Sequence, residues 1–253
     1  MRPEGGEGGK DGKDGKDGKD GKDGKDGKDG KDGKDGKDGG RTDWNAWHDD
    51  YADAGSALSE RLAVVRSEIR RALAGRVVTQ EPLTVLSACA GDGRDILGVL
   101  AEQDERLRGR VEVTLLETDR RNLDRAERFC RDTGLTEVRL VDRDAGLSHS
   151  YRDAAPADLV LMCGVFGNLC EVDVRRLIEF LPVLCRAGAT LIWTRSRRAP
   201  DLTPSIRAWL ADARFSELSF TAPPGVLGSV GVHRFYGEPQ PMPADQRLFS
   251  FLR

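Results

Sequence analysis

The chain has 253 residues, of which 40 are basic and 43 acidic, and a formal net charge of −3. This balance argues against the large basic surface that nucleic-acid binding requires. No apolar run approaches the roughly 20 residues that span a bilayer, and the chain does not open on a signal peptide, so we expect a cytoplasmic protein without a membrane segment. The five cysteines show no C-x-x-C spacing, which indicates reduced thiols and no metal site.

The first 40 residues form a low-complexity tail. KDG is repeated ten times from Lys10 to Gly39, and 11 basic residues face 12 acidic ones over residues 1–40. The repeat has no apolar side chain to bury, so nothing offsets an ordering cost of about 1–2 kcal/mol per residue. We therefore expect a disordered, nearly neutral tail. A collagen-like assembly is the weaker alternative, because the triplets contain no proline.

An aromatic segment and a helix are expected next, over residues 41–75. Residues 43–58 read DWNAWHDDYADAGSAL and are rich in aromatic and acidic side chains. Apolar residues then recur at steps of three and four, at Leu58, Leu62, Val65, Ile69 and Leu73. This spacing predicts an amphipathic helix over 56–74.

From residue 84 onward, short apolar strands alternate with helices. Strands are expected at 84–90, 111–117, 137–142, 157–164, 189–195, 215–222 and 228–235. Helices are expected from Ile96 and at 122–132, 172–185 and 205–213, the third being interrupted or bent near Pro182. The alternation predicts an α/β fold with a doubly wound, Rossmann-like, mostly parallel seven-stranded sheet, closed by an antiparallel hairpin because its last two strands are joined directly. The core would span 76–236, followed by a C-terminal extension at 237–253.

Two glycines follow the first strand, in the stretch LSACAGDGRD at 86–95. Ligands of open α/β sheets bind at the carboxyl ends of the strands, often at the first strand-to-helix turn. Gly91 and Gly93 would let a ligand approach the backbone, and the following helix would offer free N–H groups to a carboxylate or phosphate. Two glycines can also form a simple tight turn. Their position between a buried strand and a helix is what favours a ligand-binding turn.

Acidic residues follow the next two strands. Glu117 ends the second strand, where a carboxylate can hold ribose hydroxyls, and Asp119 competes for this role. Asp144 follows the third strand and could accept a hydrogen bond from an exocyclic amine. Together with the glycine turn, these acceptors predict a pocket for a nucleoside.

The order of these segments resembles that of the class I S-adenosylmethionine-dependent methyltransferases over about residues 56–235. In that family the first strand runs into an acidic residue, an apolar residue and then G-x-G-x-G. This chain has Ser87 at the acidic position and Cys89 at the first glycine. We expect the Cys89 side chain to exclude left-handed backbone there.

The resemblance implies S-adenosylmethionine as the cofactor. Its methionine end would lie against Gly91 and Gly93, its ribose against Glu117 and its adenine amine against Asp144. The cofactor-binding residues implied in this way are Ser87, Cys89, Ala90, Gly91, Gly93, Glu117, Thr118, Asp144, Ala145, Cys163 and Gly164. The implied activity is methyl transfer to an unidentified acceptor, which we expect to be a small molecule, and the loop at 162–168 would border the active site.

The aromatic segment at 43–58 has two interpretations. In the family, a segment ahead of the first strand covers the cofactor and shapes the acceptor pocket. The catalytic candidates here would be Tyr51 and His48, whose ordinary pKa near 6.5 suits a general base. Alternatively, Trp44 and Trp47 are buried against the core at the start of the helix. Methyl transfer to a reactive nucleophile also needs little acid–base help.

Two other functions stay open. A nicotinamide dinucleotide enzyme would need glycine at position 96 to complete G-x-G-x-x-G, where this chain has Ile96. A non-catalytic binding module would keep the fold without the reaction. Arg195, Arg197 and Arg198 follow the fifth strand, either as an attraction for an acidic acceptor or as solvated loop charges.

Overall fold

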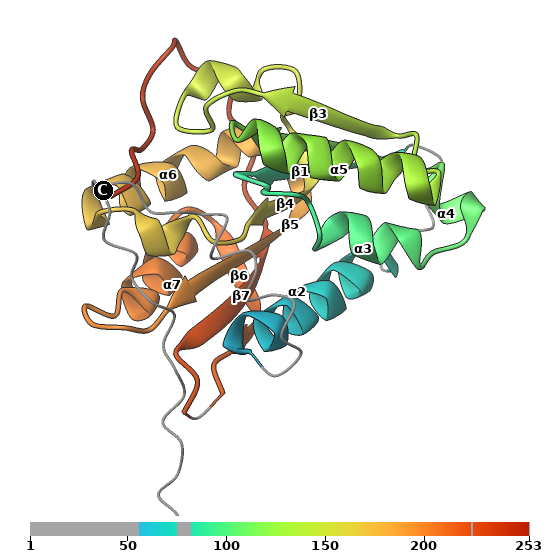
Figure 1. Cartoon of the computed structure of the whole chain (residues 1–253). Helices are drawn as coiled ribbons and strands as arrows, with labels where there is room; N and C mark the ends of the chain where they lie inside the picture. The colour runs from blue at the N-terminus through green and yellow to red at the C-terminus, as the bar shows by residue number, and fades with distance from the viewer. Residues whose placement is uncertain (1–55, 75–81, 224, 253) are drawn as a thin grey trace, which may run out of the picture. The chain divides into compact units, whose positions relative to one another are not determined.

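The computed structural model describes residues 56–74, 82–223 and 225–252. Within them, a seven-stranded sheet has the order β3-β2-β1-β4-β5-β7-β6 (Figure 1). The strands are β1 (Leu83–Ala88), β2 (Val111–Glu117), β3 (Val138–Asp142), β4 (Ala157–Met162), β5 (Cys185–Ser196), β6 (Phe215–Thr221) and β7 (Gly228–Phe235). The first five strands run parallel, and β7 is antiparallel to both β5 and β6. The predicted fold class is confirmed.

The central strands are the continuous apolar runs of the sequence. Every residue of β4 is buried, and β1 lies between β2 and β4, with Ser87 opposite both Leu115 and Leu161. Strands that are covered on both faces need apolar side chains on both faces, which explains why these runs do not alternate with polar residues. The carboxyl ends of β1, β2, β3 and β4 therefore meet at one edge.

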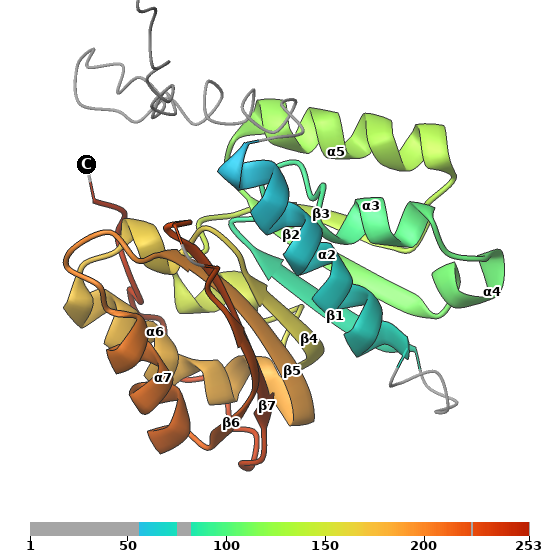
Figure 2. The same cartoon turned by 90° about the horizontal axis from the view of Figure 1, so that it is seen from below.

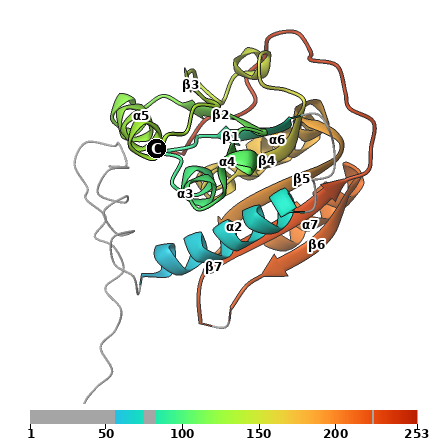
Figure 3. The same cartoon turned by 90° about the vertical axis from the view of Figure 1, so that its right-hand side faces the viewer.

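Helices cover both faces of the sheet (Figure 2). One face carries α2 (Ala57–Ala74), α3 (Ile96–Ala101), the short α4 (Glu105–Arg108) and α5 (Arg120–Thr133), and the other carries α6 (Glu171–Leu184) and α7 (Thr203–Asp212). Helix α2 contacts α3 and β7 (Figure 3), and it buries Val65, Ile69 and Leu73 there. Helix α6 continues past Pro182 to Leu184, so the predicted interruption does not occur.

One large side chain determines how β5 and β7 pack. Trp193 of β5 is fully buried and lies opposite Gly231 of β7. A Cβ at Gly231 would come within 2.3 Å of the Trp193 ring, so only glycine fits at this position. The indole Nε1–H of Trp193 donates to Nδ1 of the buried His233 at 3.2 Å.

The segment after β7 returns to the sheet. Two short 3₁₀ turns, η2 (Ser148–Tyr151) and η3 (Phe166–Asn168), follow β3 and β4. Residues beyond 236 run back along them, and Arg247 forms an antiparallel bridge with Leu147. Leu248 and Phe249 are buried in the core on the α6 face. The sequence pattern predicts no element here.

Candidate functional site

A cavity of about 240 Å³ lies at the carboxyl ends of the central strands. Pockets for small molecules usually measure roughly 300–1,000 Å³, so the described residues enclose slightly less than that range. All the predicted cofactor-binding residues except Ser87 and Gly93 line it. Ser87 is buried within β1, and a Cβ at Gly93 would meet Leu115 and Leu97 at 2.6 and 3.0 Å, so Gly93 serves the packing of α3 on the sheet.

The turn after β1 is left-handed at three alternate positions. Cys89, Gly91 and Gly93 have φ angles of 51°, 58° and 68°. The prediction that Cys89 would exclude left-handed backbone is wrong. A left-handed conformation costs an L-residue about 1–2 kcal/mol, and packing of the unbranched Cys89 side chain against the core on the α6 face offsets part of that cost. The turn thus keeps the backbone of three glycines with a cysteine at the first position.

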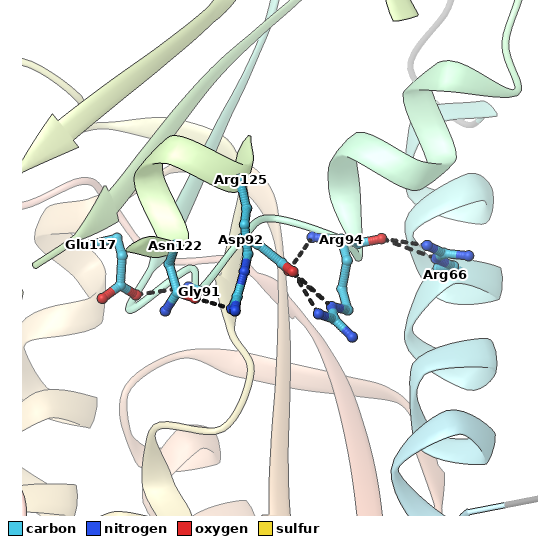
Figure 4. A network of polar contacts seen from close by, with 7 residues as sticks. All are labelled: Arg66, Gly91, Asp92, Arg94, Glu117, Asn122 and Arg125. Carbon is cyan, nitrogen blue, oxygen red and sulfur yellow. Dashed lines mark hydrogen bonds and ion pairs between the residues drawn. The ribbon is translucent and has the colours of Figure 1, made fainter. Parts of the chain in front are cut away.

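Three contacts hold this turn in place (Figure 4). Nε of Arg94 donates to Oδ1 of Asp92 at 2.9 Å, which closes the turn on itself. From α2, Nε and Nη2 of Arg66 donate to the Arg94 carbonyl at 3.1 and 2.6 Å. A Cβ at Gly98 would come within 2.3 Å of the Arg66 guanidinium, so Gly98 makes room for this contact. The cavity floor is therefore fixed from α2, α3 and the turn itself.

The third contact comes from Glu117 at the end of β2. Its Oε2 accepts the Gly91 N–H at 2.8 Å, and its Oε1 accepts the N–H groups of Thr118 and Asp119 at 2.9 and 2.8 Å. A carboxylate has about four lone-pair positions, so about one is left for a ligand. Glu117 thus joins the first two strand ends and still faces the cavity.

Asp119 is occupied by its own helix. Its carboxylate caps α5 by accepting the Arg121 N–H at 2.9 Å, and it pairs with the Arg121 guanidinium, with Nη2 of Arg121 at 2.9 Å from Oδ2. The Arg121 side chain lowers the pKa of Asp119. Both carboxylates line the cavity, and they differ in their partners: Glu117 accepts backbone N–H groups only, whereas Asp119 is also paired with a guanidinium.

Asp144 lines the cavity beyond β3. Its Oδ1 accepts the Gly146 N–H at 2.7 Å, and its Oδ2 lies 3.1 Å from Nη1 of Arg247 in the C-terminal segment. The carboxylate that the resemblance directs at an adenine amine is thus shared with an arginine from the far end of the chain.

One buried acid and two thiols line the cavity. Asp95 is 8% exposed, and burial raises its pKa. Burial also raises the pKa of the Cys89 and Cys163 thiols. The negative charge of Glu117 raises the pKa of Cys89 further, and that of Asp95 raises the pKa of Cys163 further. Both thiols are therefore protonated at neutral pH, which makes them poor nucleophiles.

Several cavity residues escaped the sequence analysis, and two predicted ones cannot be placed. Asp95, Asn122 and Phe251 line the cavity. Asp95 belongs to the quoted turn and could have been found there, whereas nothing in the sequence around Phe251 connects it with a site. The catalytic candidates His48 and Tyr51 lie outside the described residues.

Two of the three arginines at the end of β5, Arg195 and Arg197, serve the fold. Arg195 is 8% exposed and donates to the Phe166 carbonyl. Arg197 donates to the carbonyls of Pro223 and Val226. Arg198 is exposed, so the solvated-charge interpretation holds for this residue alone.

No group of three His, Cys, Asp or Glu side chains among the described residues could hold a metal ion. Across the same ranges, no helix combines the length and apolarity needed to cross a membrane.

Comparison with known sequences gives no match. No protein family matches this chain, and no curated protein matches its sequence.

Solved structures do match. The magnesium protoporphyrin IX methyltransferase of Synechocystis PCC 6803, with S-adenosylmethionine bound, is 15% identical with a TM-score of 0.59, over 76% of this chain and 90% of that one. The carbon methyltransferase CurJ is 12% identical with a TM-score of 0.58, over 77% of this chain and 59% of that one. The fold is that of the class I S-adenosylmethionine-dependent methyltransferases.

The fold alone does not decide the reaction. The [4+2]-cyclase SpnF also matches, at 14% identity and a TM-score of 0.50, over 67% of this chain and 81% of that one. Function must therefore be argued from the cavity.

Proposed function

We propose that the protein is a methyltransferase that uses S-adenosylmethionine and acts on a small-molecule acceptor. The observation that supports this most is the left-handed turn of Cys89, Gly91 and Gly93, fastened to the carboxylate of Glu117 at the cavity wall. Such a turn brings backbone close to a ligand, and the carboxylate beside it is an acceptor for ribose hydroxyls.

The cavity residues fit the parts of this cofactor. Glu117 has about one free lone-pair position, so it would accept a hydrogen bond from one ribose hydroxyl there. The second ribose hydroxyl would donate to a carboxylate oxygen that also accepts a backbone N–H. The buried carboxyl of Asp95 lines the cavity and is an acceptor for an ammonium group. Leu62, Val65 and Leu116 add apolar wall for uncharged parts of the ligand.

A nicotinamide dinucleotide fits less well. The third glycine of its fingerprint would fall at Ile96, which is fully buried in the first turn of α3. A pyrophosphate at this turn would also meet the carboxylates of Asp92 and Asp95, which line the same cavity. Like charges in one site repel, so the site disfavours phosphates.

S-adenosylmethionine supplies an electrophilic methyl group carried on a sulfonium sulfur. The residues of this chain would bind the cofactor and orient the acceptor. Alignment of the acceptor atom with the methyl group contributes much of the rate in such transfers. His48 and Tyr51 are proposed to serve the acceptor, and the cytoplasmic location is likewise a proposal from the sequence.

The test is transfer of label. The full-length protein is incubated with cell extract and S-adenosylmethionine labelled in its methyl group, and small-molecule and macromolecular fractions are counted separately. We expect label in a small molecule, and a large loss of it with Glu117→Ala. Label in neither fraction, under conditions where the cofactor is shown to bind, would leave the non-catalytic binding module as the better description.

A further inference from the structure

The C-terminal segment 247–252, here called the C-terminal strap, follows the last strand of the chain, β7, and returns to the carboxyl edge of the sheet (Figure 1). Leu248 N–H donates to the Gly146 carbonyl at 2.8 Å, and Leu252 N–H donates to the Asn168 carbonyl at 2.9 Å. Gly146 follows β3 and Asn168 follows β4. The strap therefore connects two loops that both border the cavity.

The strap is firmly attached. Leu248 and Phe249 are 0% and 1% exposed, and Ser250 N–H donates to Oδ2 of Asp173 in α6 at 3.0 Å. Arg247 forms the ion pair with Asp144. A segment held by buried side chains and backbone hydrogen bonds on both sides is a wall of the cavity, and its position is fixed before any ligand arrives.

Phe251 is the residue of the strap that lines the cavity. Its side chain is among the lining residues and is 40% exposed, and its ring packs against the buried Phe249 ring at 5.5 Å between centroids. Within the described part of the chain, Phe251 is the only aromatic side chain that lines the cavity. A flat π-system in the ligand would find its one ring partner here.

We propose that Phe251 stacks on the nucleobase of the bound nucleoside, and that the strap is a binding element of the site. An aromatic ring stacks on the face of any base. The polar atoms at the edge of the base form hydrogen bonds with polar side chains. Asp144, which is paired with Arg247 of the strap, supplies such an acceptor in the same cavity. The inference rests on the proposed function, because it requires an adenosyl ligand.

The test compares the dissociation constants of S-adenosylhomocysteine and of adenosine for the full-length protein and four variants. Phe251→Ala should weaken both ligands about 10-fold, the scale of one base–aromatic stack, and Phe251→Tyr should keep the parent affinity. Phe251→Leu keeps an apolar contact with Phe249 but has no π-face, so it should retain the melting temperature and lose affinity. Leu252→Ala is the matched control, because this neighbour is 57% exposed and does not line the cavity.

The outcomes separate two failures. If the parent binds both ligands and Phe251→Leu binds them equally well, the stacking proposal is overturned while the proposed function stands. If the parent binds neither ligand, the proposed function itself fails. Equal losses in Phe251→Leu and Leu252→Ala would also overturn the proposal, since they would show that the strap acts only through its general order.

Discussion

At the scale of single residues, Cys89 shows that a turn can keep its backbone while its sequence changes. Its φ of 51° is the conformation for which glycine is normally chosen. The departure from G-x-G-x-G was visible in the sequence, but its outcome was not, because that outcome depends on the packing that Cys89 finds against the α6 face. Glu117, in contrast, could be placed correctly at the cavity because it ends an apolar strand.

The turn predicts opposite results for two substitutions. Gly91→Val should abolish binding of S-adenosylhomocysteine, because a β-branched residue at φ of 58° is strained and displaces the backbone next to the ligand. Cys89→Gly should bind as the parent does, since it removes the left-handed penalty of about 1–2 kcal/mol. Calorimetric titration gives both affinities, and circular dichroism confirms that both variants are folded. Parent-like binding by Gly91→Val would mean that the loop is only a turn.

The two carboxylates after β2 can be told apart. Glu117→Ala should weaken S-adenosylhomocysteine by about 1.5–3 kcal/mol, or roughly 10-fold to 150-fold in Kd, because a charged acceptor is lost. Asp119→Ala removes the cap of α5 and should instead lower the free energy of unfolding by about 0.5–2 kcal/mol with little change in Kd. Titration and urea unfolding of both variants measure these effects. The reverse pattern would show that the ribose contact is misplaced.

At the scale of elements, long apolar patterns were predictable and short polar ones were not. Strand β4 was found because burial on both faces requires a nearly continuous apolar run. The four-residue α4 and the turn η2 bury few apolar residues of their own, so periodicity gives no signal for them. Pro182 was expected to interrupt or bend this helix, but α6 continues past it to Leu184, and only two helical residues follow the proline.

Strand β7 contains a buried histidine, His233, that should make the stability of the protein depend on pH. Burial lowers the pKa of His233 from 6.5 to about 4, with Arg207 also lowering it and Glu217 opposing. The unfolded chain therefore binds the proton more readily than the folded one. Stability from this residue is complete above pH 6.5 and is lost as pH falls toward 4, on the order of 3 kcal/mol in total.

The measurement is urea unfolding at pH 7 and pH 5 for the parent and for His233→Asn. The amide oxygen of asparagine can still accept the Trp193 N–H, but it does not titrate. The parent should lose more stability between the two pH values than the variant, by about 1–2 kcal/mol. Equal losses would mean that His233 has the same pKa in the folded and the unfolded chain, so that burial does not lower it.

At the scale of the whole molecule, topology determined which parts of the site could be predicted. Parallel strands joined by helices bring their carboxyl ends to one edge, so the turn after β1, Glu117 and Asp144 could be expected together. The contacts of Arg66 with Arg94 and of Arg247 with Asp144 join distant segments through surface side chains. Neither hydrophobic periodicity nor a local motif indicates such long-range contacts, so the C-terminal strap could not be predicted from the sequence.

The repeat tail should be dispensable for the folded part. Residues 1–40 lie outside the described ranges, and the KDG repeat offers no apolar side chain. Deleting residues 1–40 should leave the melting temperature and the affinity for S-adenosylhomocysteine unchanged, because no core contact is removed. Differential scanning calorimetry of the two chains makes the comparison. A melting temperature lower by several degrees in the shortened chain would show that the repeat packs on the rest.

The cavity beside the Cys89–Gly93 turn is proposed to hold an adenosyl cofactor. The most direct test of this proposal is calorimetric titration of the full-length protein with S-adenosylhomocysteine and, in parallel, with NAD. We predict a dissociation constant for S-adenosylhomocysteine on the order of micromolar, corresponding to about −8 kcal/mol, and no measurable binding of NAD. Binding of NAD without binding of S-adenosylhomocysteine would contradict the account.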